Sequence, residues 1–228
     1  MSADGSALHF ETRHGEQQVY RLTDNSVLYL NSDSTVSIRY TPHERYVVLS
    51  AGEAYFAVAH EPGRPFRVAT GGAEVRAVGT RFDVRLAGEA TVVTVVQGRV
   101  AVEPGLTEGN SSQPIKYSSA FVELGADEQI RVVPGEWPPQ PPTMADAQLS
   151  TAWLHRNITF NHEPLDRVTL EFNRYAPKPI EIATPALRKL EITGNFATDD
   201  TAAFLAFLRS LEGVRVEETA TQFRVSRD

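Results

Sequence analysis

Apolar and polar residues alternate in short runs between about Val19 and Val133, as in residues 36–40, 54–58 and 82–86. This alternation puts the apolar side chains of an extended strand on one face, as a half-buried sheet requires. Clusters of turn-forming residues separate the runs at intervals of roughly ten residues, which is typical of an all-β sandwich, barrel or stacked sheet. Residues 91–96 are apolar almost throughout, which predicts a strand covered on both faces. No helical period of useful length precedes residue 145.

Residues 134–142 interrupt this pattern with five prolines. Proline fixes the backbone and cannot donate a hydrogen bond to a central sheet, so the segment predicts a semi-rigid linker. A long loop inside one domain remains the alternative. We expect an all-β domain over residues 1–133, a linker over 134–150 and a second domain over 151–228.

The second domain mixes strand and helix patterns. A strand is expected at residues 157–160, and Pro164 suits the first turn of a helix whose apolar stripe is Leu165, Val168, Phe172 and Tyr175. Two strands follow, at residues 180–182 and 190–196.

A second helix is expected after Thr198 and Asp199, which offer a cap and first-turn negative charge. Its apolar stripe comprises Phe204, Phe207, Leu208 and Leu211. A hairpin of residues 214–216 and 222–225 closes the chain. The order β-α-β-β-α-β-β predicts a small α+β domain, and the whole chain is expected to be mainly β.

Composition limits the function classes. The chain has 228 residues, of which 41% are hydrophobic and 22% charged, as in soluble globular proteins. Residues 151–228 hold 10 basic and 11 acidic residues and residues 1–150 hold 12 and 18, so the acidic excess lies in the first part. Acidic surfaces repel phosphate backbones, so we expect no nucleic-acid partner. No run approaches the ~18 apolar residues of a membrane span. Cysteine is missing, which excludes disulfides and thiol catalysis.

Four stretches of the first part together resemble the FecR domain, in which a glycine–glutamate turn leads into an aromatic strand. They are residues 49–60, 64–68, 77–84 and 95–100. The second part is similar to the short domain at the N-terminus of secretins and TonB-dependent receptors. The residues that carry this second resemblance are Trp153, Phe160, Pro164, Leu165, residues 172–175 and residues 192–196.

This resemblance implies that the chain is the periplasmic signal-receiving region of a transmembrane FecR-type anti-sigma regulator. The implied partner is the N-terminal signalling domain of a TonB-dependent outer-membrane transporter, whose ligand is often a ferric siderophore. The resemblance also implies envelope proteases and an extracytoplasmic-function sigma factor, bound through a cytoplasmic segment that this chain lacks. The chain itself carries no membrane span.

Enzymatic chemistry has little support in the sequence. Three His–Glu dipeptides begin at His43, His60 and His162, but adjacent strand residues point to opposite faces, so each supplies one metal ligand at most. There is no G-x-S-x-G elbow, phosphate loop or G-x-G-x-x-G. Glu123, Asp127 and Glu128 are the candidates for a carboxylate pair, although acidic residues near a glycine more often decorate a loop. We expect no catalytic residues, no cofactor, no metal and no enzymatic activity.

The main alternative function is a carbohydrate- or cell-wall-binding all-β module. Modules of that kind present exposed aromatic side chains, and Tyr55, Tyr117 and Trp137 are the candidates. A structural role in an envelope assembly is a third option.

We expect the partner to bind residues 151–228 at a sheet edge, where unpaired backbone groups accept another strand. Two strands with alternating apolar residues are candidates. Their residues are Leu190, Ile192, Gly194 and Phe196 in the first, and Gln222, Phe223, Arg224 and Val225 in the second. The alternative is that the apolar members of both sets belong to the core.

Overall fold

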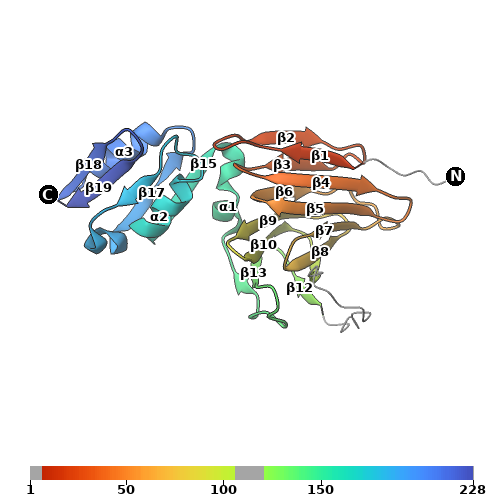
Figure 1. Ribbon diagram of the computed structural model, residues 1–228. Coiled ribbons are helices and arrows are strands. Elements are labelled where there is room, and N and C mark those ends of the chain that lie inside the picture. The colour runs from red at the N-terminus through yellow and green to blue at the C-terminus, as the bar shows by residue number, and fades with distance from the viewer. Residues whose placement is uncertain (1–6, 106–120, 228) are drawn as a thin grey trace. The chain divides into compact units, whose positions relative to one another are not determined.

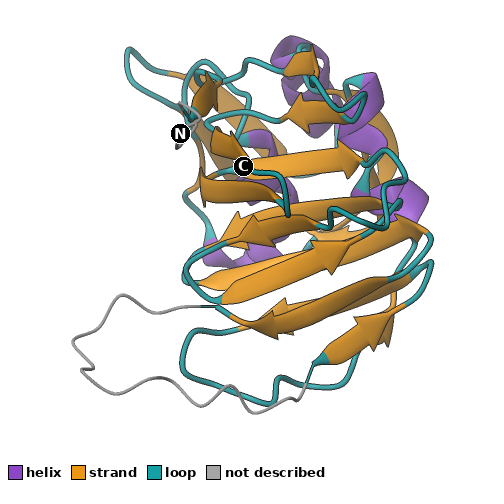
Figure 2. Cartoon of the chain, turned by 90° about the vertical axis from the view of Figure 1, so that its right-hand side faces the viewer, coloured by secondary structure: helices purple, strands orange, loops and turns teal. Residues whose placement is uncertain are grey.

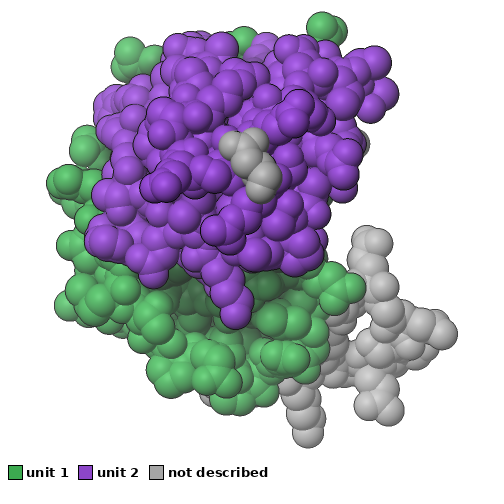
Figure 3. All heavy atoms as spheres, turned by 90° about the vertical axis from the view of Figure 1, so that its left-hand side faces the viewer, with its two compact units in different colours: residues 1–13, 17–150 green, residues 14–16, 151–228 purple. Residues whose placement is uncertain are grey.

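Strands dominate the computed structural model, which describes residues 7–105 and 121–227 (Figure 1, Figure 2). Strands account for 47% of the chain and helices for 15%, which confirms the prediction of a mainly β protein. The chain divides into two units, one made of residues 1–13 and 17–150 and the other of residues 14–16 and 151–228 (Figure 3).

The first unit contains two seven-stranded sheets among its described residues. In spatial order, the first sheet is β1 (Leu8–Glu11), β4 (Thr35–Tyr40), β5 (Arg45–Ala51), β7 (Phe66–Ala69), β8 (Ala73–Ala77), β11 (Val100–Pro104) and β12 (Val122–Leu124). The second sheet is β14 (Thr143–Met144), β13 (Glu128–Val132), β10 (Ala90–Gln97), β9 (Arg81–Ala87), β6 (Glu53–Ala57), β3 (Val27–Leu30) and β2 (Gln18–Arg21). All neighbours are antiparallel except β5 and β7, which are parallel.

The expected alternation is visible strand by strand. On β5, Arg45, Val47 and Leu49 are buried, whereas Tyr46 and Val48 are half-buried on the opposite face. The inward residues of both sheets form one continuous hydrophobic core. β10 lies between β9 and β13 and has buried residues on both faces, as its nearly continuous apolar pattern predicted.

Gly52 lies where the chain passes from β5 in the first sheet to β6 in the second. Its φ is +78°, and a Cβ there would lie 2.6 Å from the Asp33 carbonyl oxygen. The Ser34 hydroxyl accepts a hydrogen bond from the Glu53 amide at 2.9 Å, and Asn31 Nδ2 donates to Glu53 Oε2 at 2.6 Å. The segment that contains Asn31 and Ser34 has the composition of a surface turn, but it is largely buried. Its hydrogen bonds form a polar network that fixes the passage of the chain from β5 to β6.

Residues 134–150, which the prolines predict as a linker, are counted with the first unit. Trp137 packs against the core of that unit, and β14 pairs with β13. The short helix α1 (Ala147–Ser150) lies against β10. The division between the units falls at Ser150–Thr151.

The second unit follows the predicted order β-α-β-β-α-β-β, with two short 3-10 helices added. Its elements are η1 (Ala152–His155), β15 (Asn157–Pro164), α2 (Leu165–Phe172), β16 (Ile180–Ile182), η2 (Pro185–Lys189), β17 (Glu191–Ala197), α3 (Thr201–Ser210), β18 (Val214–Glu218) and β19 (Phe223–Arg227). β15 and β17 form one antiparallel sheet, and β16, β19 and β18 form the other. Each of α2 and α3 contacts strands of both sheets.

The helices bury most of the predicted stripes, although Tyr175 and Leu211 lie just past the ends of α2 and α3. Leu165, Val168 and Phe172 on α2 are buried, and the Phe172 ring stacks on Phe204 of α3 at 3.7 Å between centroids. The expected cap of the second helix is wrong by one or two residues, because Asp200 Oδ1 accepts from the Ala203 amide at 2.9 Å.

Candidate partner-binding edge

β17 has one open edge. It pairs with β15 on one side, and the described residues place no strand on the other. The Thr198 amide donates to the Arg156 carbonyl at 2.8 Å, and the Leu190 carbonyl accepts from the Leu165 amide at 2.8 Å. Backbone groups of successive strand residues point to alternate sides, so the even-numbered residues face β15. The backbone N–H and C=O groups of Thr193 and Asn195 therefore face the open side.

The inward face of β17 is apolar. Ile192 is buried at 1% exposure, while Phe196 is half-buried. The Phe196 ring lies 5.2 Å from Phe207 of α3, which is also half-buried. A Cβ on Gly194 would lie 2.9 Å from the Phe196 ring, so this glycine allows the ring to fold back along its own strand. Phe196 and Phe207 form what we call the aromatic shelf of β17.

The outward face of β17 is polar. Glu191, Thr193 and Asn195 are exposed there. β15 is irregular opposite this face: its register shifts between Phe160 and Glu163, and His162 has a φ of +53°. The His162 amide donates to Thr193 Oγ1 at 2.9 Å, and its Nδ1 lies 3.2 Å from Glu191 Oε2. These contacts hold the β15 bulge against one side of β17 and leave the opposite edge of β17 free.

The structure places the first predicted set at this edge. Ile192, Gly194 and Phe196 belong to β17, and Leu190 immediately precedes it. Ile192 and Phe196 contribute to the core and the aromatic shelf, so their side chains face inward. The groups available to a partner strand are the backbone groups of Thr193 and Asn195, which lie between them.

The second predicted set does not lie at an edge. β19 has β16 on one side and β18 on the other, so the expectation of an open edge at Gln222, Phe223, Arg224 and Val225 is wrong. Phe223 and Val225 are buried in the core, at 7% and 0% exposure. β16 pairs with β19 in parallel from some 40 residues earlier in the chain, a non-local pairing that a local pattern does not reveal.

Helical spacing places Phe207 in the apolar stripe of α3 but does not predict that its partly exposed ring lies beside Phe196 of β17. The spacing does indicate partial exposure, because the apolar stripe covers a wide arc of α3. The stripe comprises Phe204, Phe207, Leu208 and Leu211. Phe204 and Leu208 are fully buried, and Phe207 and Leu211 at the margin of the arc are half-buried.

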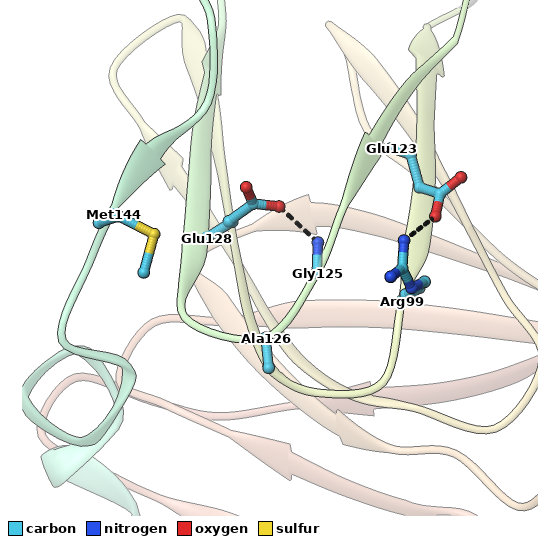
Figure 4. Close-up of a pocket in the computed structure, with 6 residues that line it drawn as sticks. All are labelled: Arg99, Glu123, Gly125, Ala126, Glu128 and Met144. Carbon is cyan, nitrogen blue, oxygen red and sulfur yellow. Dashed lines mark hydrogen bonds and ion pairs between the residues drawn. The ribbon is translucent and has the colours of Figure 1, made fainter.

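Glu123 and Glu128, two of the three carboxylates considered for catalysis, line a separate hollow in the first unit that also includes Met144 (Figure 4). Glu123 Oε1 accepts from Arg99 Nη1 at 2.6 Å, and Glu128 Oε2 accepts from the Gly125 amide at 2.6 Å. Asp127 is exposed at the turn between β12 and β13. Each of the two glutamates is held by its own local contact rather than paired with the other.

The remaining candidates are dispersed. In the described parts of the chain, no group of three or more His, Cys, Asp or Glu residues is placed to hold a metal ion. Of the aromatic residues considered for carbohydrate binding, Tyr55 is buried at 6% exposure and Trp137 packs partly against the core. Tyr117 lies outside the described residues. Over residues 7–105 and 121–227, no helix has the length and apolar character needed to span a membrane.

Comparison with known proteins finds a family model that matches part of the first unit. Residues 9–101 match the model of the FecR protein family. Two crystal structures of a proposed anti-sigma factor from Parabacteroides distasonis, at 2.50 and 1.65 Å resolution, have TM-scores of 0.75 and 0.76 to this chain. Each is 25% identical in sequence and covers 97% of this chain and 99% of its own. A search of curated protein sequences gave no match. Residues 9–101 are thus similar in sequence to the FecR family, and the chain as a whole is similar in fold to these structures.

Proposed function

We propose that this chain is the periplasmic signal-receiving region of a FecR-type transmembrane anti-sigma regulator. The FecR match over residues 9–101 supports this proposal, as does the likeness to a proposed anti-sigma factor over nearly the whole of both chains. The role is one of protein recognition and regulation, without enzymatic activity.

The proposed partner is the N-terminal signalling domain of a TonB-dependent outer-membrane transporter, which docks on the open edge of β17. The observation that carries this assignment is the row of outward-facing backbone groups at Thr193 and Asn195. An incoming strand would complete their hydrogen bonds, and its inward side chains would cover the aromatic shelf of Phe196 and Phe207. Main-chain pairing supplies affinity in this mode, and the alternate side chains supply specificity.

Docking would report the state of the transporter, including occupancy by a ferric siderophore. The proposed consequence is cleavage of the regulator by envelope proteases and release of an extracytoplasmic-function sigma factor. Both steps act on membrane and cytoplasmic segments outside these 228 residues. The part of the mechanism assigned to this chain is recognition of the signalling domain.

The test compares Thr193→Pro with Thr193→Ala in titration calorimetry against the signalling domain of the cognate transporter. Both substitutions remove the Thr193 hydroxyl, which accepts from the His162 amide of β15, but only proline also removes the edge-facing amide. We expect Thr193→Pro to weaken binding about tenfold or more, because one lost hydrogen bond and a blocked strand each cost roughly 1 kcal/mol. Thr193→Ala should stay within about twofold.

Circular dichroism of both variants verifies that the second unit remains folded. Phe207→Ala provides a second probe, because it removes half of the aromatic shelf and leaves the β17 backbone intact. Unchanged affinity of both folded Thr193→Pro and folded Phe207→Ala would place the docking surface elsewhere.

A further inference from the structure

The first unit contains a cavity of about 750 Å³ at the end of β5. Strand β5 continues to Ala51, three residues past its last pair with β7 at Val48 and Ala69. The β7–β8 hairpin and the β9–β10 hairpin form the other walls. The lining residues are Tyr46, Val48, Leu49, Ser50, Ala69, Thr70, Gly71, Gly72, Glu74, Leu86, Gly88, Glu89 and Thr91. We call it the hairpin cavity.

We propose that the hairpin cavity binds a basic side chain, lysine or arginine, carried on an extended peptide segment of a partner protein. This site lies in the first unit and is independent of the β17 edge.

The walls of the cavity are fixed by hydrogen bonds within and between the hairpins. The hydroxyls of Thr70 and Thr91 lie 2.8 Å apart and are both buried, so they join the β7–β8 hairpin of one sheet to β10 of the other. The Thr70 amide donates to the Ala73 carbonyl at 2.8 Å and closes the β7–β8 turn. A Cβ on Gly71 would meet no atom within 4 Å, so the space in front of this turn is open. The cavity is therefore preformed, as binding sites usually are.

Glu74 places a nearly buried carboxylate in the wall. The residue is 8% exposed, and its Oε1 accepts from Arg67 Nε at 2.6 Å. Its second oxygen, Oε2, has no hydrogen bond to any described residue. Tyr46 lies in the same wall; burial and the negative charge of Glu74 raise the pKa of its hydroxyl, which therefore stays protonated. An ammonium or guanidinium group would donate to this second oxygen, to which no described residue donates a hydrogen bond.

The charge of the lining selects a cation. Its charged residues are Glu74 and Glu89, and no lysine, arginine or histidine is among them. Two cations lie next to the cavity and have partners of their own: Arg67 contacts Glu44 at 3.4 Å in addition to Glu74, and the Arg39 guanidinium lies 5.7 Å from the centroid of the Tyr46 ring. Val48 and Leu86 add apolar surface that suits the aliphatic stem of lysine or arginine.

The peptide form of the ligand follows from the shape of the entrance. Past Val48, β5 has β4 on one side but no longer pairs with β7 on the other, so Leu49 and Ser50 border the cavity along an unpaired strand edge. A short extended segment can lie beside this edge while its basic side chain reaches Glu74. A free amine would use the carboxylate alone and leave the strand edge uncovered.

The proposal is tested by NMR titration of the ¹⁵N-labelled chain with acetyl-Val-Lys-Val-amide. Acetyl-Val-norleucine-Val-amide is the matched probe, because it keeps the length and the aliphatic stem and lacks the charge. We expect the lysine peptide to shift the amide signals of Gly71, Gly72 and Gly88 with saturation in the millimolar range. The norleucine peptide should bind at least about tenfold more weakly, the difference that one charge-assisted hydrogen bond supplies.

Two variants and one control assign the contact. Glu74→Gln should abolish the preference for lysine over norleucine, whereas Glu44→Gln, which removes a partner of the same Arg67 outside the cavity, should preserve it. Gly71→Phe should block both peptides by filling the open space, which keeps the test valid if Glu74→Gln fails to fold. Equal binding of the two peptides to the wild-type chain, or no shift at the three glycines, would overturn the proposal.

Discussion

Arg45 Nη1 lies 2.8 Å from Asp24 Oδ2 in the interior of the first unit, and the two side chains are 0% and 1% exposed. Arg45 belongs to β5 in the first sheet, and Asp24 lies in the turn between β2 and β3 in the second. The same guanidinium donates to the carbonyl oxygens of Ala59 at 3.0 Å and Arg64 at 2.9 Å. This buried pair therefore joins the two sheets at one end of the core.

Replacing Asp24 by asparagine should destabilise the first unit strongly. The substitution preserves size but removes the close, buried counter-ion of Arg45 and leaves only Glu61, which is 41% exposed and lies 3.9 Å from Arg45 Nη1. Removing one partner of a buried ion pair typically costs about 3–5 kcal/mol. Urea denaturation at pH 7 measures the change in the free energy of unfolding. Glu123→Gln is the matched control, because Arg99 and Glu123 form an ion pair that is 76% and 49% exposed. Its loss should cost less than about 1 kcal/mol, and equal effects of the two substitutions would contradict the role given to Arg45.

The contribution of Asp24 should depend on pH in a defined direction. Burial by itself raises the pKa of the Asp24 carboxyl, but hydrogen bonds from Ser26 and Arg45 outweigh it, so the pKa lies below its ordinary value. A lowered folded-state pKa gives stability that is fully present above the unfolded value of about 3.9 and is lost as pH falls through the folded value.

The difference in unfolding free energy between the wild type and Asp24→Asn should thus be constant from pH 7 to about pH 5 and should shrink below about pH 4. Denaturation curves of both proteins at a series of pH values measure this difference. A gap that widens with acidification would mean that the folded-state pKa is raised rather than lowered.

Phe172→Ala should unfold the second unit or bring it close to unfolding. Phe172 is fully buried and stacks on Phe204, and truncation of such a ring typically costs about 3–5 kcal/mol. Thermal melting followed by circular dichroism measures the effect. Leu170→Ala is the control on the same helix, because Leu170 is 67% exposed. Its effect should stay within about 0.5 kcal/mol, and similar losses in both variants would show that α2 is packed differently.

Local patterns predicted most of the fold. Strict alternation on β5, with Val47 and Leu49 inward, is visible in the sequence because one face of its sheet is buried. The stripe of Leu165, Val168 and Phe172 predicted α2 because one face of that helix is buried. Asn31 and Ser34 belong to one of the clusters of turn-forming residues, but serine and asparagine form both turns and buried polar networks. The choice between them depends on Glu53, which is 22 residues away from Asn31.

The candidate edge was predicted only in part. Both 190–196 and 222–225 have the apolar spacing of strands, and that spacing does not show which strand has neighbours on both sides. The parallel pairing of Ile180 with Phe223 places β19 in the middle of its sheet. The hairpin cavity was not predicted at all, because Tyr46, Glu74 and Glu89 come from separate strands and turns that only the folded chain brings together.

Hydrogen exchange at the open edge of β17 tests the proposed docking most directly. Amide exchange rates of the ¹⁵N-labelled chain are compared with and without a saturating amount of the unlabelled signalling domain of the cognate transporter. If a partner strand pairs with β17, the amides of Thr193 and Asn195 should exchange at least about tenfold more slowly in the complex, because each gains a hydrogen bond. Amides of β12, which ends its sheet among the described residues of the first unit, should be unchanged. A complex that forms while Thr193 and Asn195 exchange at their free rates would contradict docking at this edge.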